Sequence, residues 1–152
     1  MHGTGKTIAI ATLIAGTLDI LFAMILTLLF GREVGNMLRY VASGPFPAAT
    51  GMGPAGAILG LVVHFALMGI MAAAYVLFAR SPRREHLRDM PYRAGMAYGL
   101  ITYAIMNWIV VALRFGTPLP PKPLSIATQL FAHIVLVGIP MALITARAMR
   151  SR

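Results

Sequence analysis

The chain contains no cysteine and only four acidic residues, and both shortages restrict its chemistry. Without cysteine there is no disulfide, no thiolate ligand and no cysteine nucleophile, which excludes zinc-thiolate and iron–sulfur sites. The sequence also lacks an HExxH motif, and neither His64 nor His133 has a serine or threonine beside it. With a single carboxylate inside its apolar segments, the chain offers no carboxylate pair for acid–base work. These absences favour a role other than catalysis.

Charge of either sign is scarce, whereas apolar residues are abundant. Of 152 residues, 59% are hydrophobic and 11% are charged, and the mean hydropathy is +0.79. A hydrocarbon core of roughly 30 Å needs about 20 helical residues. Four apolar segments reach that length, at 8–30, 55–79, 94–113 and 124–146. The sequence therefore predicts an all-α membrane protein: a single-domain bundle of four transmembrane helices that run up-down-up-down.

The basic residues give a net charge of +9, which could indicate nucleic acid as a partner. Their positions argue against it, because nine of the thirteen lie at the termini or between spans two and three, and four lie on the opposite side. The positive-inside rule then predicts cytoplasmic N- and C-termini. We expect the arginines of the middle loop to contact anionic lipid headgroups, at about 1 kcal/mol each: Arg80, Arg83, Arg84 and Arg88.

Between spans one and two lies a short amphipathic segment. Val34, Met37, Leu38 and Val41 follow the i, i+3, i+4, i+7 spacing of one helical face, and Gly44 then precedes a proline. This pattern predicts a short helix in the outer membrane interface, either a connector that seals the bundle or a lid over a ligand.

Two glycine pairs predict close approaches between helices. Gly56 and Gly60 form a GxxxG motif in span two, and Gly95 and Gly99 form another in span three. In lipid, small residues let backbones pack closely. The contacts could form inside the bundle or with another subunit.

Each span carries one residue that is expensive to place in hydrocarbon: Asp19, His64, Asn107 and His133. We count residues from the outer ends of the spans at about 1.5 Å per residue. All four then lie within roughly 8 Å of one another along the membrane normal. Since no lysine or arginine lies inside a span, a histidine is the expected hydrogen-bond partner of Asp19, directly or through water.

This polar layer has three interpretations. It is a buried network that fixes helix packing, or a layer that binds or conducts a proton or small solute. In the third, His64 and His133 are axial ligands of a b-type haem, or they hold a divalent metal together with Asp19.

Several segments resemble small, uncharacterised bacterial inner-membrane proteins of the YagU type. They are AGTLDILFA (15–23), VASGPFPAA (41–49), LGLVVHFALMG (59–69), YGLITYAIMNWIVV (98–111) and LFAHIVLVGIPMALI (130–144). The resemblance implies a four-helix protein of the inner membrane and brings no activity or cofactor with it.

The sequence thus favours a non-catalytic accessory or interaction subunit of the inner membrane. The alternative is a protein that binds or transports a proton, a small solute, haem or a metal through the polar layer. The expected partners are the lipid bilayer and a larger membrane complex or further copies of the chain, and not nucleic acid.

Overall fold

The four predicted spans are present as long helices. The computed structural model describes residues 2–81, 84 and 86–150. Span one is α1 (His2–Leu29) and span two is α3 (Gly53–Ala79). Span three comprises α5 (Pro91–Tyr103), η3 (Ala104–Val110) and α6 (Val111–Phe115), and span four comprises α7 (Pro123–Phe131), η4 (Ala132–Gly138) and α8 (Ile139–Arg150). The prediction of an all-α, four-span protein is confirmed.

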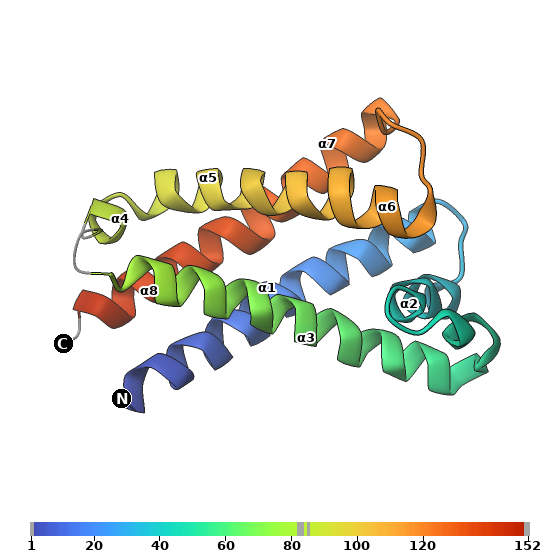
Figure 1. Cartoon of the computed structure of the whole chain (residues 1–152), viewed down its shortest axis with the longest axis horizontal. Coiled ribbons are helices and arrows are strands. Elements are labelled where there is room, and N and C mark those ends of the chain that lie inside the picture. Colours follow the sequence, from blue (N-terminus) through green and yellow to red (C-terminus); the bar gives the residue numbers. More distant parts are fainter. Residues whose placement is uncertain (1, 82–83, 85, 151–152) are drawn as a thin grey trace.

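Consecutive spans run in opposite directions, so the termini share one end of the bundle (Figure 1). This terminal end also carries α4 (His86–Asp89). The opposite end, called the loop end below, carries α2 (Val34–Ser43), η1 (Pro47–Gly51) and the proline-rich segment before α7. Span one packs against spans two and four, and span four packs against span three.

Prolines and glycines set the ends of the spans. Pro54, Pro91 and Pro123 stand in the first turns of α3, α5 and α7, where the missing N–H is harmless. Gly31 and Gly116 adopt φ values of +65° and +61° just after spans one and three, a conformation that favours glycine.

Spans three and four each contain a π-helix, which the sequence did not predict. In η4 the cause is Pro140, because it has no N–H to continue the α-helical ladder just after this segment. In η3 the Asn107 amide donates to the Tyr103 carbonyl, the acceptor that the α-helical pattern assigns to the N–H of residue 107. Each π-helix widens its helix at a polar-layer residue, since Asn107 lies in η3 and His133 in η4.

Gly95 and Gly99 bring spans three and four into backbone contact. A Cβ on Gly95 would lie 2.6 Å from Ile139 Cα, and one on Gly99 would lie 2.6 Å from Ile134 Cα. Gly138 faces them from span four, where a Cβ would overlap the Gly95 carbonyl oxygen. The predicted close approach therefore forms inside the bundle and includes a third glycine that the GxxxG pattern did not contain.

Gly56 and Gly60 also pack within the chain, but not against another span. A Cβ on Gly56 would overlap the Ala49 carbonyl in η1, and one on Gly60 would overlap the Leu38 carbonyl in α2. These glycines let α2 lie directly on the first turns of α3. In Figure 1, α2 is seen nearly end-on, so it crosses the direction of the spans.

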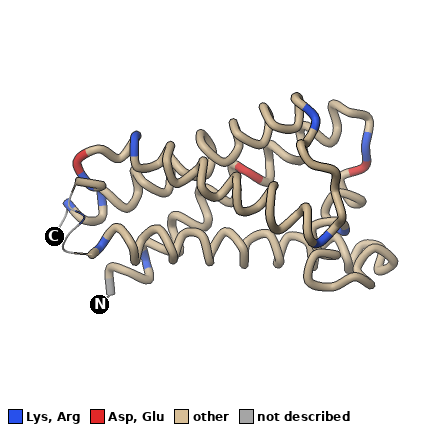
Figure 2. The backbone as a smooth tube through the Cα atoms, turned by 45° about the horizontal axis from the view of Figure 1, so that its top comes forward, with Lys and Arg blue, Asp and Glu red and all other residues tan. Residues whose placement is uncertain are grey.

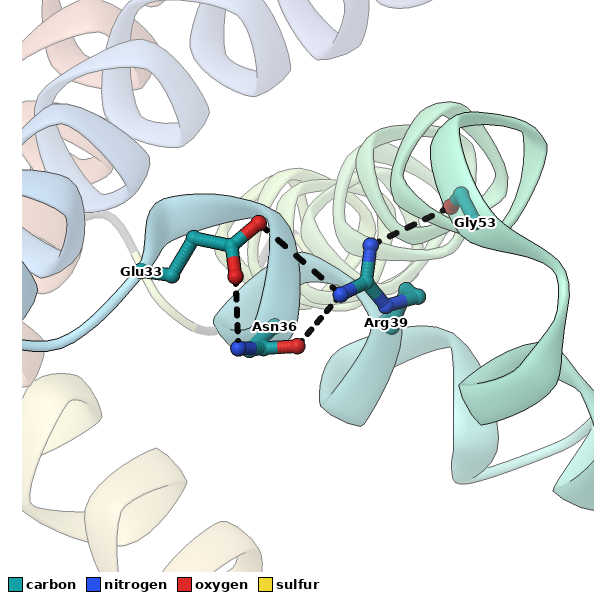
Figure 3. Close-up of polar contacts among 4 residues, drawn as sticks. All are labelled: Glu33, Asn36, Arg39 and Gly53. Atoms are coloured by element: carbon teal, nitrogen blue, oxygen red, sulfur yellow. Dashed lines mark hydrogen bonds and ion pairs between the residues drawn. The ribbon is translucent and has the colours of Figure 1, made fainter.

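Polar contacts hold the ends of α2. At its start, Asn36 Nδ2 donates to Glu33 Oε2 over 2.8 Å, and the Arg39 guanidinium reaches the Asn36 side chain and the Gly53 carbonyl (Figure 3). At its end, Arg114 of α6 donates to the Ser43 carbonyl over 2.8 Å and to the Gly44 carbonyl over 2.6 Å. A cation on the last carbonyls of a helix is favourable, so α6 fixes α2 across the loop end.

The outer surface of the spans is apolar. In the most apolar 18-residue stretch of each span, only 17 to 28% of the residues are buried within the chain. The spans therefore leave a large apolar surface for contact with lipid. The lysines and arginines lie at the two ends of the bundle (Figure 2). Together these features make the chain a multi-pass membrane protein.

Candidate functional site

His64 is held by span one. Its Nε2 lies 2.9 Å from the Gly16 carbonyl oxygen, so Nε2 carries the proton and donates it. The close packing of spans one and two at this point favours glycine at position 16, because a Cβ there would lie 2.8 Å from the Phe65 ring. The Phe65 ring of span two therefore lies directly against span one at this position.

Asp19 lies beside the other nitrogen of the same imidazole. Its Oδ2 is 4.0 Å from His64 Nδ1, which is an ion-pair distance but longer than a hydrogen bond. The histidine beside Asp19 is therefore His64, and of the two predicted arrangements, a direct hydrogen bond or one through water, the distance is too long for the direct bond. The separation leaves both groups able to bind a third polar atom between them.

Asn107 and His133 form a second pair, between the two π-helices. Asn107 Nδ2 lies 3.4 Å from His133 Nε2, and Thr102 Oγ1 lies 3.3 Å from His133 Nδ1. Because the Thr102 hydroxyl donates to the Gly99 carbonyl over 3.0 Å, it accepts from His133 Nδ1, and Nε2 is left to accept from Asn107. The polar layer thus consists of two separate pairs rather than one hydrogen-bonded network.

Both pairs line a single cavity of about 340 Å³, called the central cavity below. Every span contributes to its wall, and α2 covers it with Met37, Tyr40 and Val41. The wall is mostly apolar, and four of its side chains are methionines, which adapt their shape to what they contact: Met37, Met68, Met71 and Met106. The four polar residues that depth counting assigned to one layer thus all line this cavity.

The central cavity adjoins two others at the loop end. One, of about 360 Å³, contains Arg32 and Lys122 in its wall, and the second, of about 300 Å³, lies under the proline-rich segment 117–121. Ser125 lines all three cavities, and Gln129 lines the central one and the one with the two cations. The three cavities therefore share wall residues between the loop end and the polar layer.

Toward the terminal end the bundle is closed. Ala15, Ala72, Val137 and Met141 are at most 1% exposed and belong to one packed core. The hydroxyl of Tyr98 donates to the Met71 carbonyl over 2.7 Å and joins spans two and three at this level. Among the described residues, the wall between the central cavity and the terminal end is thus tightly packed.

Sequence reasoning missed Tyr40, Ser125 and Gln129. Tyr40 stacks on Phe115 with ring centroids 4.3 Å apart and is one of the residues by which α2 covers the cavity. Burial raises the pKa of Tyr40 and the nearby Arg114 opposes this, so the phenol stays protonated at neutral pH. A lid was one of the two predicted roles for α2, and its position over the cavity favours that role. Nothing in the sequence distinguished Ser125 and Gln129 as cavity residues, because polar residues are common near the start of a helix.

The side chains do not assemble the expected metal or haem site. In residues 2–81, 84 and 86–150, no three histidine, aspartate or glutamate side chains gather as metal ligands, so Asp19, His64 and His133 give no three-ligand site. Both nitrogens of His133 already have protein partners, and Nε2 of His64 donates to a carbonyl. Only Nδ1 of His64 is left to ligate, one nitrogen where bis-histidine haem needs two.

The arginines expected at the lipid headgroups lie at the terminal end. The Arg84 guanidinium carbon is 3.3 Å from the centroid of the Phe78 ring, and Arg88 pairs with Asp89 over 3.5 Å. Arg80 and Arg88 line one shallow pocket there. Arg83 lies outside the described residues.

Comparison with protein-family models, with curated proteins and with solved structures finds no match to this chain. The resemblance to the YagU type stays a prediction.

Proposed function

We propose that this chain is a binding protein of the bacterial inner membrane that takes up a small organic molecule into the central cavity from the loop end. The observation that carries the proposal is a cavity that contains Asp19, His64, Asn107 and His133 and shares the wall residues Ser125 and Gln129 with a cavity at the loop end. A network needed only for packing would be filled by side chains. Ligand pockets, in contrast, are concave and mostly apolar, with a few converging polar groups.

The lining describes the class of ligand. Methionine, leucine and phenylalanine side chains suit an apolar body, and the two polar pairs suit a hydrogen-bonding group at its inner end. Arg32 and Lys122 make the loop end positively charged, which favours the approach of a ligand that is neutral or negatively charged. The wall toward the terminal end is tightly packed, so the proposal concerns binding and not passage across the membrane.

The orientation follows from the distribution of cations. The described lysines and arginines of the terminal end are Lys6, Arg80, Arg84, Arg88, Arg93, Arg147 and Arg150, whereas four lie toward the loop end. The positive-inside rule then places both termini in the cytoplasm and the loop end on the outer side. An accessory role in a larger complex or an oligomer of this chain ranks second, because the distinctive polar groups lie in the interior.

A fluorescent probe tests the proposal. 1-Aminoanthracene has an apolar body and one amine, so we expect saturable fluorescence enhancement with the purified protein. Ala23→Trp places a large side chain in the central cavity, and we expect it to weaken binding at least tenfold, or about 1.4 kcal/mol. Ile25→Trp on the same helix is the matched control, because Ile25 is 55% exposed on the outer surface.

Two results would contradict the proposal. The first is enhancement that rises with probe concentration without saturating, as expected for partition into detergent alone. The second is equal binding by the wild-type chain and the Ala23→Trp variant.

A further inference from the structure

A second concave site lies at the terminal end, between α1 and α8. These helices contact each other (Figure 1). A groove of about 590 Å³ is lined by residues of both. It shares no lining residue with the central cavity. An inference from it is therefore independent of the function proposed above.

The groove is polar at its outer rim and apolar below. Lys6, Ile10 and Ile14 follow one another at i, i+4 and i+8 on one face of α1, so the cation lies at the end of the bundle and the isoleucines lie deeper. From α8, Arg147 and Ile144 line the groove in the same order. In both walls the cation lies at the end of the bundle and the apolar surface lies deeper. A phospholipid in a membrane has the same order, with its headgroup outermost and its acyl chains below.

The charge at the rim selects the kind of headgroup. Lys6 and Arg147 are both exposed. The three carboxylates in the described part of the chain contact other side chains, namely His64, Arg39 and Arg88. No described carboxylate thus contacts the rim, and its two cations favour an anionic headgroup over a zwitterionic one.

We propose that this groove is a binding site for one anionic phospholipid, with the phosphate on Lys6 and Arg147 and an acyl chain along Ile10, Ile14 and Ile144. The site differs from general attraction to a charged surface because it includes an apolar wall of fixed shape. It also differs from the arginines of the α3–α5 loop, which do not line it.

Native mass spectrometry of the full chain in mild detergent tests the site. The protein is titrated with dioleoylphosphatidylglycerol and, separately, with dioleoylphosphatidylcholine. We expect the first phosphatidylglycerol to bind at least tenfold more tightly than phosphatidylcholine, and this preference to shrink as ionic strength rises. The Lys6→Gln/Arg147→Gln double variant should bind both lipids equally.

Two matched controls separate the groove from its surroundings. Arg88→Gln/Arg93→Gln removes the same charge from the same end outside the groove, and we expect it to keep the preference. Ile14→Trp should block the acyl chain and lower affinity for phosphatidylglycerol, whereas Leu13→Trp on the neighbouring exposed face should not.

Three results would overturn the proposal. The wild-type chain could bind both lipids alike, or the Arg88→Gln/Arg93→Gln variant could lose the preference as fully as the groove variant. Dimer peaks that disappear on Ile14→Trp, without lipid adducts, would assign the groove to a second copy of the chain.

Discussion

Replacing Gly138 by alanine is expected to lower the thermal stability of the protein strongly. The added Cβ would overlap the Gly95 carbonyl oxygen and lie 2.8 Å from the Gly99 nitrogen. Both neighbours are backbone atoms, so no side-chain rotation relieves the contact. Overpacking typically costs 1–3 kcal/mol and sometimes more, and we expect about 3 kcal/mol, measured as a lower melting temperature in detergent.

Gly69→Ala is the matched control for this prediction. It adds the same methyl group to the middle of a span, but its nearest contact would be Thr12 Oγ1 at 3.8 Å, an ordinary van der Waals distance. We expect it to melt with the wild-type chain or above it, because alanine favours the helix. If Gly138→Ala and Gly69→Ala melt together, spans three and four are not in backbone contact at Gly138.

The second large effect is expected for His64→Leu. The substitution removes the hydrogen bond to the Gly16 carbonyl and the contact of Nδ1 with the Asp19 carboxyl group. Leaving a partly buried carboxylate without its partner is strongly destabilising, commonly by 3–5 kcal/mol in protein interiors. Because the central cavity gives Asp19 some access to water, we expect about 3 kcal/mol, measured by thermal unfolding.

A double variant separates the two losses. In the His64→Leu background, Asp19→Asn exchanges the unpaired carboxylate for a neutral amide, and we expect it to recover part of the lost stability. In the wild-type background the same substitution should be destabilising, since it removes a partner of His64. If Asp19→Asn has the same effect in both backgrounds, the two residues are not coupled.

The span count and the depth of the polar residues were predictable because they depend only on helical rise and hydropathy. The apolar segments at 8–30, 55–79, 94–113 and 124–146 correspond to helices that begin one to six residues earlier and differ by at most four residues at their other ends. Depth alone was enough to place Asp19 and His133 on the same cavity. Depth does not determine which face of a span points into the bundle.

The pairing of the polar residues depends on helix rotation, which the π-helices change. One extra residue in a turn rotates everything beyond it by about 100°. Pro140 follows η4, but η3 contains no proline, and its cause is a side-chain hydrogen bond of Asn107 that periodicity does not show. The partition into Asp19–His64 and Asn107–His133 therefore required coordinates.

The glycine motifs illustrate the same limit. The pattern at Gly95 and Gly99 identified a close helix contact, but the same pattern at Gly56 and Gly60 serves α2 and η1 instead of a span. The spacing of a GxxxG motif shows where another segment can pack closely against the backbone. It does not show which segment packs there. Gly138 has no partner at GxxxG spacing in its own helix, so no motif marked it.

The proposed binding function requires that water and small solutes reach the polar layer from the loop end. Because the chain has no cysteine, a single Asn107→Cys substitution can be followed with a membrane-impermeant methanethiosulfonate reagent. Ile109→Cys is the matched control: it lies in the same π-helix, but it is 52% exposed and does not line the cavity.

Labelling in spheroplasts and in inverted membrane vesicles then gives the most direct test. The structure and the proposed orientation predict modification of Asn107→Cys from the outer side, none from the cytoplasmic side, and no modification of Ile109→Cys from either. An Asn107→Cys variant that is unreactive from both sides, or that reacts no faster than Ile109→Cys, would contradict the account.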